Sequence, residues 1–100
     1  MNDEVLNKLY GQMSSVHDKA ESVFNTSKLS TMLQNEYKNK VSQYNEMYDS
    51  LEEMKSLTTN EEALENLINQ QIEVLRTRIK WQVDWVGRAI DYNKGKNELV

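Results

Sequence analysis

The sequence predicts an all-α protein, and three observations support that prediction. The 100-residue chain contains no proline and only three glycines, so little in it interrupts a long helix. Residues that favour helix formation, such as Glu, Lys, Gln, Leu and Met, are abundant. Apolar residues recur at helical spacings rather than alternating as they do in a strand. We therefore expect a single helical domain over residues 1–100.

The first expected helix covers residues 3–24. Two rows of apolar or weakly apolar residues recur every seven positions, as in a coiled coil. The rows are Leu9, Val16, Val23, Ser30, Tyr37, Tyr44 and Leu51, and Leu6, Met13, Ala20, Ser27, Gln34, Val41 and Tyr48. Both turn polar within residues 27–34, and Asn25, Thr26 or Ser27 can cap a new helix there. The pattern leaves open whether the first helix is continuous with the second or folds back on it.

Two further helices are expected over residues 27–56 and 60–92, joined by a tight turn. Thr59 and Glu62 have the spacing of a capping box at the start of the last helix. Gly95 is a candidate for the left-handed residue that ends it, which leaves residues 93–100 as a flexible tail. The two helices match in length, at roughly 50 Å for the longer one at about 1.5 Å per residue. We expect them to form an antiparallel helical hairpin.

The last helix carries two apolar faces when it is projected at about 100° per residue. An aliphatic stripe, expected to form the hairpin core, contains Leu64, Ile68, Ile72, Leu75, Ile79, Val83, Val86 and Ile90. A second, largely aromatic stripe lies about 135° away and contains Leu67, Val74, Trp81, Trp85 and Tyr92. A surface helix needs only one apolar stripe, so we expect this helix to pack against two neighbouring helices.

The second neighbour is either residues 3–24, folded back as a third helix, or another protein. Trp and Tyr are enriched at interface hot spots, and the preceding helix offers a soft surface rich in Tyr and Met. We therefore favour a helical partner, which is either another protein or a second copy of the chain. The predicted partner interface contains Leu67, Val74, Trp81, Trp85, Tyr92, Tyr37, Tyr44, Met47 and Tyr48.

No pattern of residues in the sequence indicates catalysis. His17 is the only histidine, and the chain contains no cysteine and no Glu-x-x-His motif. The carboxylates of Glu52, Glu53, Glu61 and Glu62 gather around an exposed turn, which is a poor setting for acid–base chemistry. We expect a protein that is not an enzyme and needs neither cofactor nor metal. The net charge of −4 also disfavours nucleic-acid binding.

The sequence shows no targeting or membrane-spanning segment. "MNDEVLNKLYG" lacks the basic and then apolar pattern of a cleaved secretion signal, and no apolar stretch is long enough to cross a membrane. We expect a cytoplasmic protein that does not insert into membranes and that, if secreted, is exported without a cleaved signal peptide.

In length, acidity, lack of cysteine and hairpin pattern, the chain resembles the small helical-hairpin proteins of bacterial type VII secretion. These are the WXG family and the accessory proteins that pair with toxin leader domains. Trp85-Val86-Gly87 matches the family's Trp-x-Gly in letters, but the family places it at the mid-chain turn and here it lies in the last helix. Tyr48 and Glu52 match the family's secretion motif, although they precede the turn. The resemblance implies a non-enzymatic adaptor that binds a toxin leader domain or a similar small helical protein.

Two other functions stay open from the sequence. A self-assembling subunit of a helical secretion structure would also use a two-helix hairpin with an acidic turn. An acidic immunity or inhibitor protein would block a basic target by charge complementarity.

Overall fold

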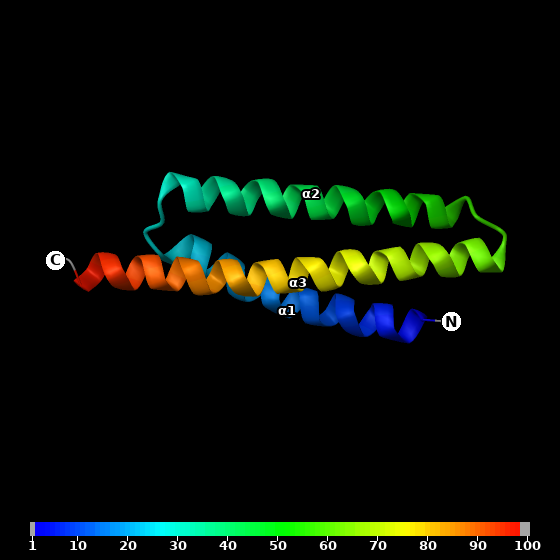
Figure 1. Ribbon diagram of the computed structural model, residues 1–100, viewed down its shortest axis with the longest axis horizontal. Coiled ribbons are helices and arrows are strands. Elements are labelled where there is room, and N and C mark those ends of the chain that lie inside the picture. The colour runs from blue at the N-terminus through cyan, green and yellow to red at the C-terminus, as the bar shows by residue number, and fades with distance from the viewer. Residues whose placement is uncertain (1, 99–100) are drawn as a thin grey trace.

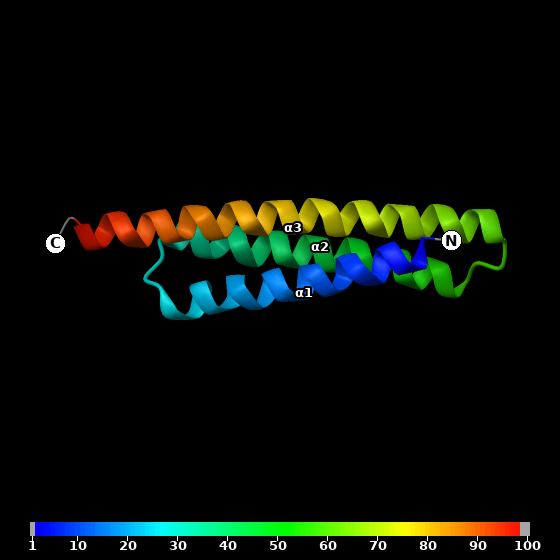
Figure 2. The same cartoon turned by 90° about the horizontal axis from the view of Figure 1, so that it is seen from below.

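The computed structural model describes the backbone of residues 2–98 and the side chains as far as residue 95. It confirms the all-helical prediction with three helices, α1 (Asp3–Thr26), α2 (Thr31–Ser56) and α3 (Glu61–Glu98). Figures 1 and 2 show a slender rod in which α1 and α3 run in one direction and α2 runs in the other. The rod measures 60 × 21 × 15 Å.

Residues 3–24 fold back as part of a third helix that packs along α3. The buried side chains of α1 are Leu6, Met13 and Ala20, which belong to one of the two seven-residue rows. At the end of α1, the Thr26 hydroxyl donates a hydrogen bond of 2.7 Å to the carbonyl of Ser22 and so extends the helix. Ser27 then has extended backbone angles.

The second helix begins later than the sequence predicts. Ser30 is its N-cap, because the Ser30 hydroxyl accepts a hydrogen bond of 3.2 Å from the backbone N–H of Leu33. The prediction that α2 starts near residue 27, capped by one of residues 25–27, is therefore wrong. The cause is that residues 25 and 26 are used to complete α1.

The ends of α3 also differ from the prediction. Asn60 caps its N-terminus through a hydrogen bond of 3.0 Å from the Ala63 N–H to Asn60 Oδ1, so the cap lies one residue after Thr59. At the other end the helix runs through Gly95 to Glu98. No glycine within residues 2–98 has a positive φ, so Gly95 does not end the helix. The backbone of residues 93–98 is helical where a tail was expected, and residues 99–100 lie outside the described part.

The core consists of two clusters along α3. The first joins Leu6 and Met13 of α1 to Ile68, Ile72 and Leu75. The second joins Ala20, Leu29, Leu33, Tyr37, Trp85 and Ala89. Both α1 and α2 therefore pack mainly on α3, which carries the longest buried face of the molecule.

The aliphatic stripe of α3 forms core only in its first half. Val83 and Ile90 are 56% and 48% exposed, so the expectation that the whole stripe is core is wrong. The reason is that the buried face of α3 is centred between the two predicted stripes. At about 100° per residue, that centre is occupied by Gln71, Arg78, Gln82 and Ala89, and all four are buried.

Candidate functional site

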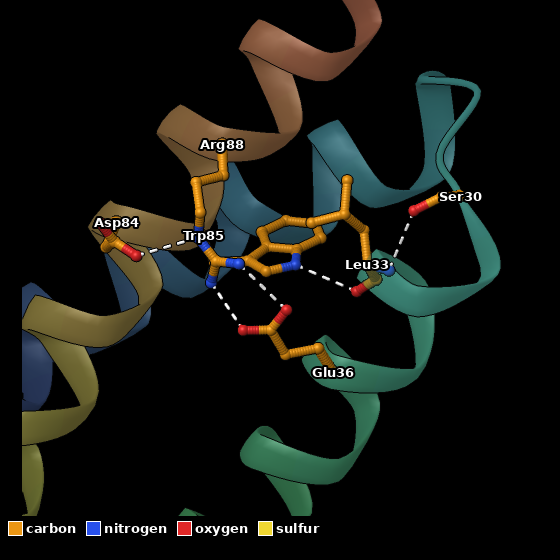
Figure 3. A network of polar contacts seen from close by, with 6 residues as sticks. All are labelled: Ser30, Leu33, Glu36, Asp84, Trp85 and Arg88. Atoms are coloured by element: carbon orange, nitrogen blue, oxygen red, sulfur yellow. Dashed lines mark hydrogen bonds and ion pairs between the residues drawn. The ribbon is translucent and has the colours of Figure 1, made fainter.

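Trp85 lies inside the bundle. Its side chain is 0% exposed, and its ring centroid lies 4.5 Å from that of Tyr37 in α2 and 6.4 Å from that of Phe24 in α1. The indole Nε1 donates a hydrogen bond of 3.0 Å to the carbonyl oxygen of Leu33, as Figure 3 shows. The structure corrects the expectation that this indole faces a partner, because helices of its own chain cover it.

The other predicted interface residues divide into three groups. Leu67, Val74, Tyr37 and Tyr44 are buried, whereas Trp81, Tyr48 and Tyr92 are half-buried. Trp81 packs near Tyr44, with ring centroids 6.4 Å apart. Met47, at 51% exposed, is the member of the set that projects from the surface. The aromatic stripe is therefore mostly an internal surface between α2 and α3.

The Tyr48–Glu52 pair, singled out as a possible secretion motif, lies within α2. The Tyr48 ring packs against Tyr10 of α1, with centroids 5.6 Å apart. Glu52 accepts a hydrogen bond of 2.6 Å from Gln71 Nε2 and lies 3.4 Å from the ammonium of Lys55. Both side chains thus make contacts within the chain.

A polar layer that the sequence analysis missed crosses the middle of the bundle. Arg78, 5% exposed, donates from Nε to Gln82 Oε1 (3.1 Å) and from Nη1 to Asn45 Oδ1 (2.7 Å). Its Nη2 lies 3.3 Å from His17 Nδ1. Burial lowers the pKa of this guanidinium. Among the side chains described, no carboxylate forms an ion pair with Arg78.

The polar layer continues towards the surface through His17. Its Nε2 lies 3.5 Å from a carboxylate oxygen of Glu21, which also accepts a hydrogen bond of 2.9 Å from the Tyr37 hydroxyl. An Arg78 N–H pointing at Nδ1 requires that nitrogen to be unprotonated, so the ring proton lies on Nε2 and faces Glu21. The layer joins all three helices, and its buried polar groups are satisfied by one another.

A signal for this layer exists in the sequence. Residues 78 and 82 fall in the gap between the two apolar stripes, so a single broad buried face with a polar centre would have placed them inside. The described residues contain no cluster of His, Asp and Glu side chains that could hold a metal ion. The same residues include no helix apolar and long enough to cross a membrane.

A second set of polar contacts holds α2 to α3 beside Trp85. Arg88 donates two hydrogen bonds to Glu36, of 3.0 and 2.7 Å, and a third of 3.0 Å to Asp84 (Figure 3). The Arg88 guanidinium lowers the pKa of the Glu36 carboxyl, and the two carboxylates raise the pKa of Arg88. These contacts lie beside the Trp85 indole and hold α2 against α3 there.

An open groove of about 590 Å³ lies between α2 and α3. It lies nearer than Trp85 to the N-terminal end of α3. Its lining consists of Met47, Ser50, Leu51, Asn69, Gln70, Glu73 and Val74. Met47, Leu51 and Val74 give it an apolar floor, and the remaining side chains form a polar rim. Two of these residues, Met47 and Val74, belong to the predicted partner interface, so part of that prediction coincides with an accessible apolar surface.

The fold and these surfaces define a rod-shaped, three-helix protein with apolar side chains exposed along its length. Comparisons with protein-family models, with curated proteins and with solved structures found no match.

Proposed function

We propose that the protein is a non-enzymatic adaptor that binds another helical protein in the α2–α3 groove. The observation that carries the proposal is the apolar floor of the groove, in which Met47 is exposed, Leu51 is half-buried and Val74 is buried. An apolar centre with a polar rim is the usual composition of a protein interface. Methionine is common on surfaces that accept helices, because its side chain adapts to the partner.

The spacing of the groove residues suits a helical partner. Met47 and Leu51 of the groove lie four residues apart along α2, and Met54, which is outside the groove lining, continues the row three residues later. Met47 and Met54 are about half exposed. A helix laid in the groove would present side chains at the same intervals, which is the pattern of helix-in-groove recognition. In the type VII secretion hypothesis, that helix belongs to the leader domain of a toxin, and the protein helps to present the toxin for export.

The test is co-purification from the native cell with a tag on this chain. We expect one helical protein at fixed stoichiometry, and we expect Met47→Asp to remove it. Met32→Asp is the matched control, because Met32 is an exposed methionine on the same helix and does not line the groove. Circular dichroism should show equal helix content in both variants.

Two results would count against the proposal. If Met47→Asp and Met32→Asp retain the partner equally, the groove is not its binding site. If the wild-type chain polymerises alone and retains no other protein, a self-assembling subunit is the better description. For the secretion hypothesis, the co-purified protein should accumulate inside cells from which this chain is deleted, and unchanged export would exclude that role.

A further inference from the structure

A second apolar surface lies along the seam between α1 and α3. We call it the outer stripe and define it by Leu9, Val16, Val23, Val83, Val86 and Ile90. The three residues of α1 and Val86 are half-buried, whereas Val83 and Ile90 are 56% and 48% exposed. None of them lines the α2–α3 groove.

Helical geometry places both halves of the outer stripe on the side of the bundle that faces away from α2. On α1, Tyr10 and Phe24 contact α2, and the Leu9–Val16–Val23 row lies about 100° round the helix from them. On α3, Trp81 contacts α2, and Val83 and Ile90 lie about 170° round from it. Val83 and Ile90 therefore face away from α2, whereas Leu9, Val23 and Val86 also pack against the core clusters.

Gly87 lies beside the exposed part of this stripe, four residues after Val83 and three before Ile90 along α3, and about 40–60° further round the helix towards the basic border. A glycine inside a helix costs about 1 kcal/mol relative to alanine. A Cβ added at Gly87 would meet no atom within 4 Å, and the residue has no positive φ, so nothing within the chain requires glycine there. A position without a side chain lets another backbone approach closely.

Basic residues border the outer stripe. On each helix, basic residues lie next to the outer stripe round the circumference. They are Lys8 and Lys19 on α1 and Arg76, Lys80 and Lys94 on α3, and all five are exposed. The nearest acidic residues on α3 lie farther round. They are Glu73, Asp91 and Asp84. Glu73 lies 3.4 Å from Arg76 Nη1, and Asp84 pairs with Arg88 at 3.0 Å. This border is basic although the chain as a whole has a net charge of −4.

We propose that the outer stripe binds an amphipathic helix of another protein whose apolar face is bordered by Asp and Glu. The part of α3 between Arg76 and Lys94 is about 27 Å long at 1.5 Å per residue, which matches about five turns of a partner helix. A second copy using the same stripe would bring the two basic borders together, and that repulsion argues for a partner of opposite charge. The inference rests on the proposed function only in taking the partner to be helical.

The probe is a pair of synthetic helical peptides with the same leucine face. One carries Glu on both borders of that face, and the other carries Lys. We expect the Glu peptide to bind at least about tenfold more tightly by calorimetry, with a preference that shrinks as salt is added. Val83→Asp should abolish binding, and the double variant Arg76→Glu, Lys80→Glu should reverse the preference. Equal affinity for the two peptides would overturn the proposal.

Matched glycine variants test the close approach. Gly87→Leu should weaken binding of the Glu peptide at least about tenfold, because the new side chain fills the space for the partner backbone. Gly11→Leu is the control, since a Cβ at Gly11 also meets nothing within 4 Å and Gly11 lies away from the stripe. Unchanged binding by Gly87→Leu would contradict the proposed contact.

Two further measurements separate this inference from the proposed function. Met47→Asp disables the groove, so peptide binding that survives in Met47→Asp supports the outer stripe whether or not the groove has a partner. Sedimentation of the wild-type chain should show a monomer at the concentrations used for binding. A dimer that Val83→Asp dissociates would make a second copy the occupant and overturn the proposal.

Discussion

The indole Nε1 of Trp85 donates a hydrogen bond of 3.0 Å to the carbonyl oxygen of Leu33, although 52 positions separate the two residues. Leu33 lies in the first turn of α2, where its own N–H donates to the Ser30 cap. One residue therefore fixes both the start of α2 and its position against α3. The side chain that the sequence marked as a partner contact is instead what aligns these two helices.

Replacing Trp85 should destabilise the protein severely. Trp85→Ala removes a completely buried ring, and we expect a loss of about 3–5 kcal/mol in the free energy of unfolding. Trp81→Ala is the comparison, and its cost should be smaller because Trp81 is only half-buried. Urea unfolding followed by far-ultraviolet circular dichroism measures both. Equal costs would mean that Trp85 is no better covered in solution than Trp81.

The two halves of the aliphatic stripe should respond differently to truncation. Ile72 is buried between α1 and α3, so Ile72→Ala should cost about 2–5 kcal/mol. Val83 is mostly exposed, so Val83→Ala should change stability by about 0.5 kcal/mol or less. Thermal unfolding of the two variants checks the pair. A large cost at Val83 would show that the outer stripe is covered in solution.

The polar layer should show strong non-additivity. Arg78→Met removes the donor to Asn45 and Gln82. Asn45 is exposed and can bond to water, whereas the buried oxygen of Gln82 is left without a donor at a cost of about 1–3 kcal/mol. The triple variant Arg78→Met, His17→Leu, Gln82→Leu removes the layer rather than one member, and should be more stable than Arg78→Met alone. Denaturant midpoints of the two variants decide this. A triple variant less stable than the single one would mean that the layer stabilises the fold as a unit.

Stability should fall at alkaline pH. Burial raises the pKa of the Tyr37, Tyr44 and Tyr48 hydroxyls above their ordinary value, most strongly at Tyr37. A raised folded-state pKa contributes stability that is fully present below the unfolded value near 10 and is lost as the pH rises through the folded value. Unfolding free energies measured above pH 10 should therefore decrease. Tyr37→Phe should make the decrease smaller, and an identical decrease would contradict the role of Tyr37.

Much of the fold could be predicted because helix formation depends on local features. The absence of proline, the spacing of Leu6, Met13 and Ala20, and the acidic first turn of α3 are all visible in the sequence. The exact caps could not be assigned, because several neighbouring residues offer a side-chain oxygen. Of these neighbours, Ser30 and Asn60 are the residues whose side chains accept from the first turns of α2 and α3.

The interface prediction failed at the indole for a different physical reason. A periodic pattern shows that Trp85 must be covered, and it contains no information on whether the cover comes from the same chain. Arg78 and Gln82 were missed because the two apolar stripes were interpreted as separate faces, which leaves the polar residues between them on the surface. Their position between two stripes was the available sign that the two stripes form the flanks of one buried face.

The sequence separations of the contacts bear on the chain entropy that each helix pairing costs. Near the α2–α3 turn, Gln71 bonds to Glu52 and Lys55 across 19 and 16 residues, whereas α1 meets α3 across 61 residues at His17 and Arg78. Closing a short loop costs less chain entropy than closing a long one. We therefore expect the pairing of α2 with α3 to cost less chain entropy than the docking of α1 on α3.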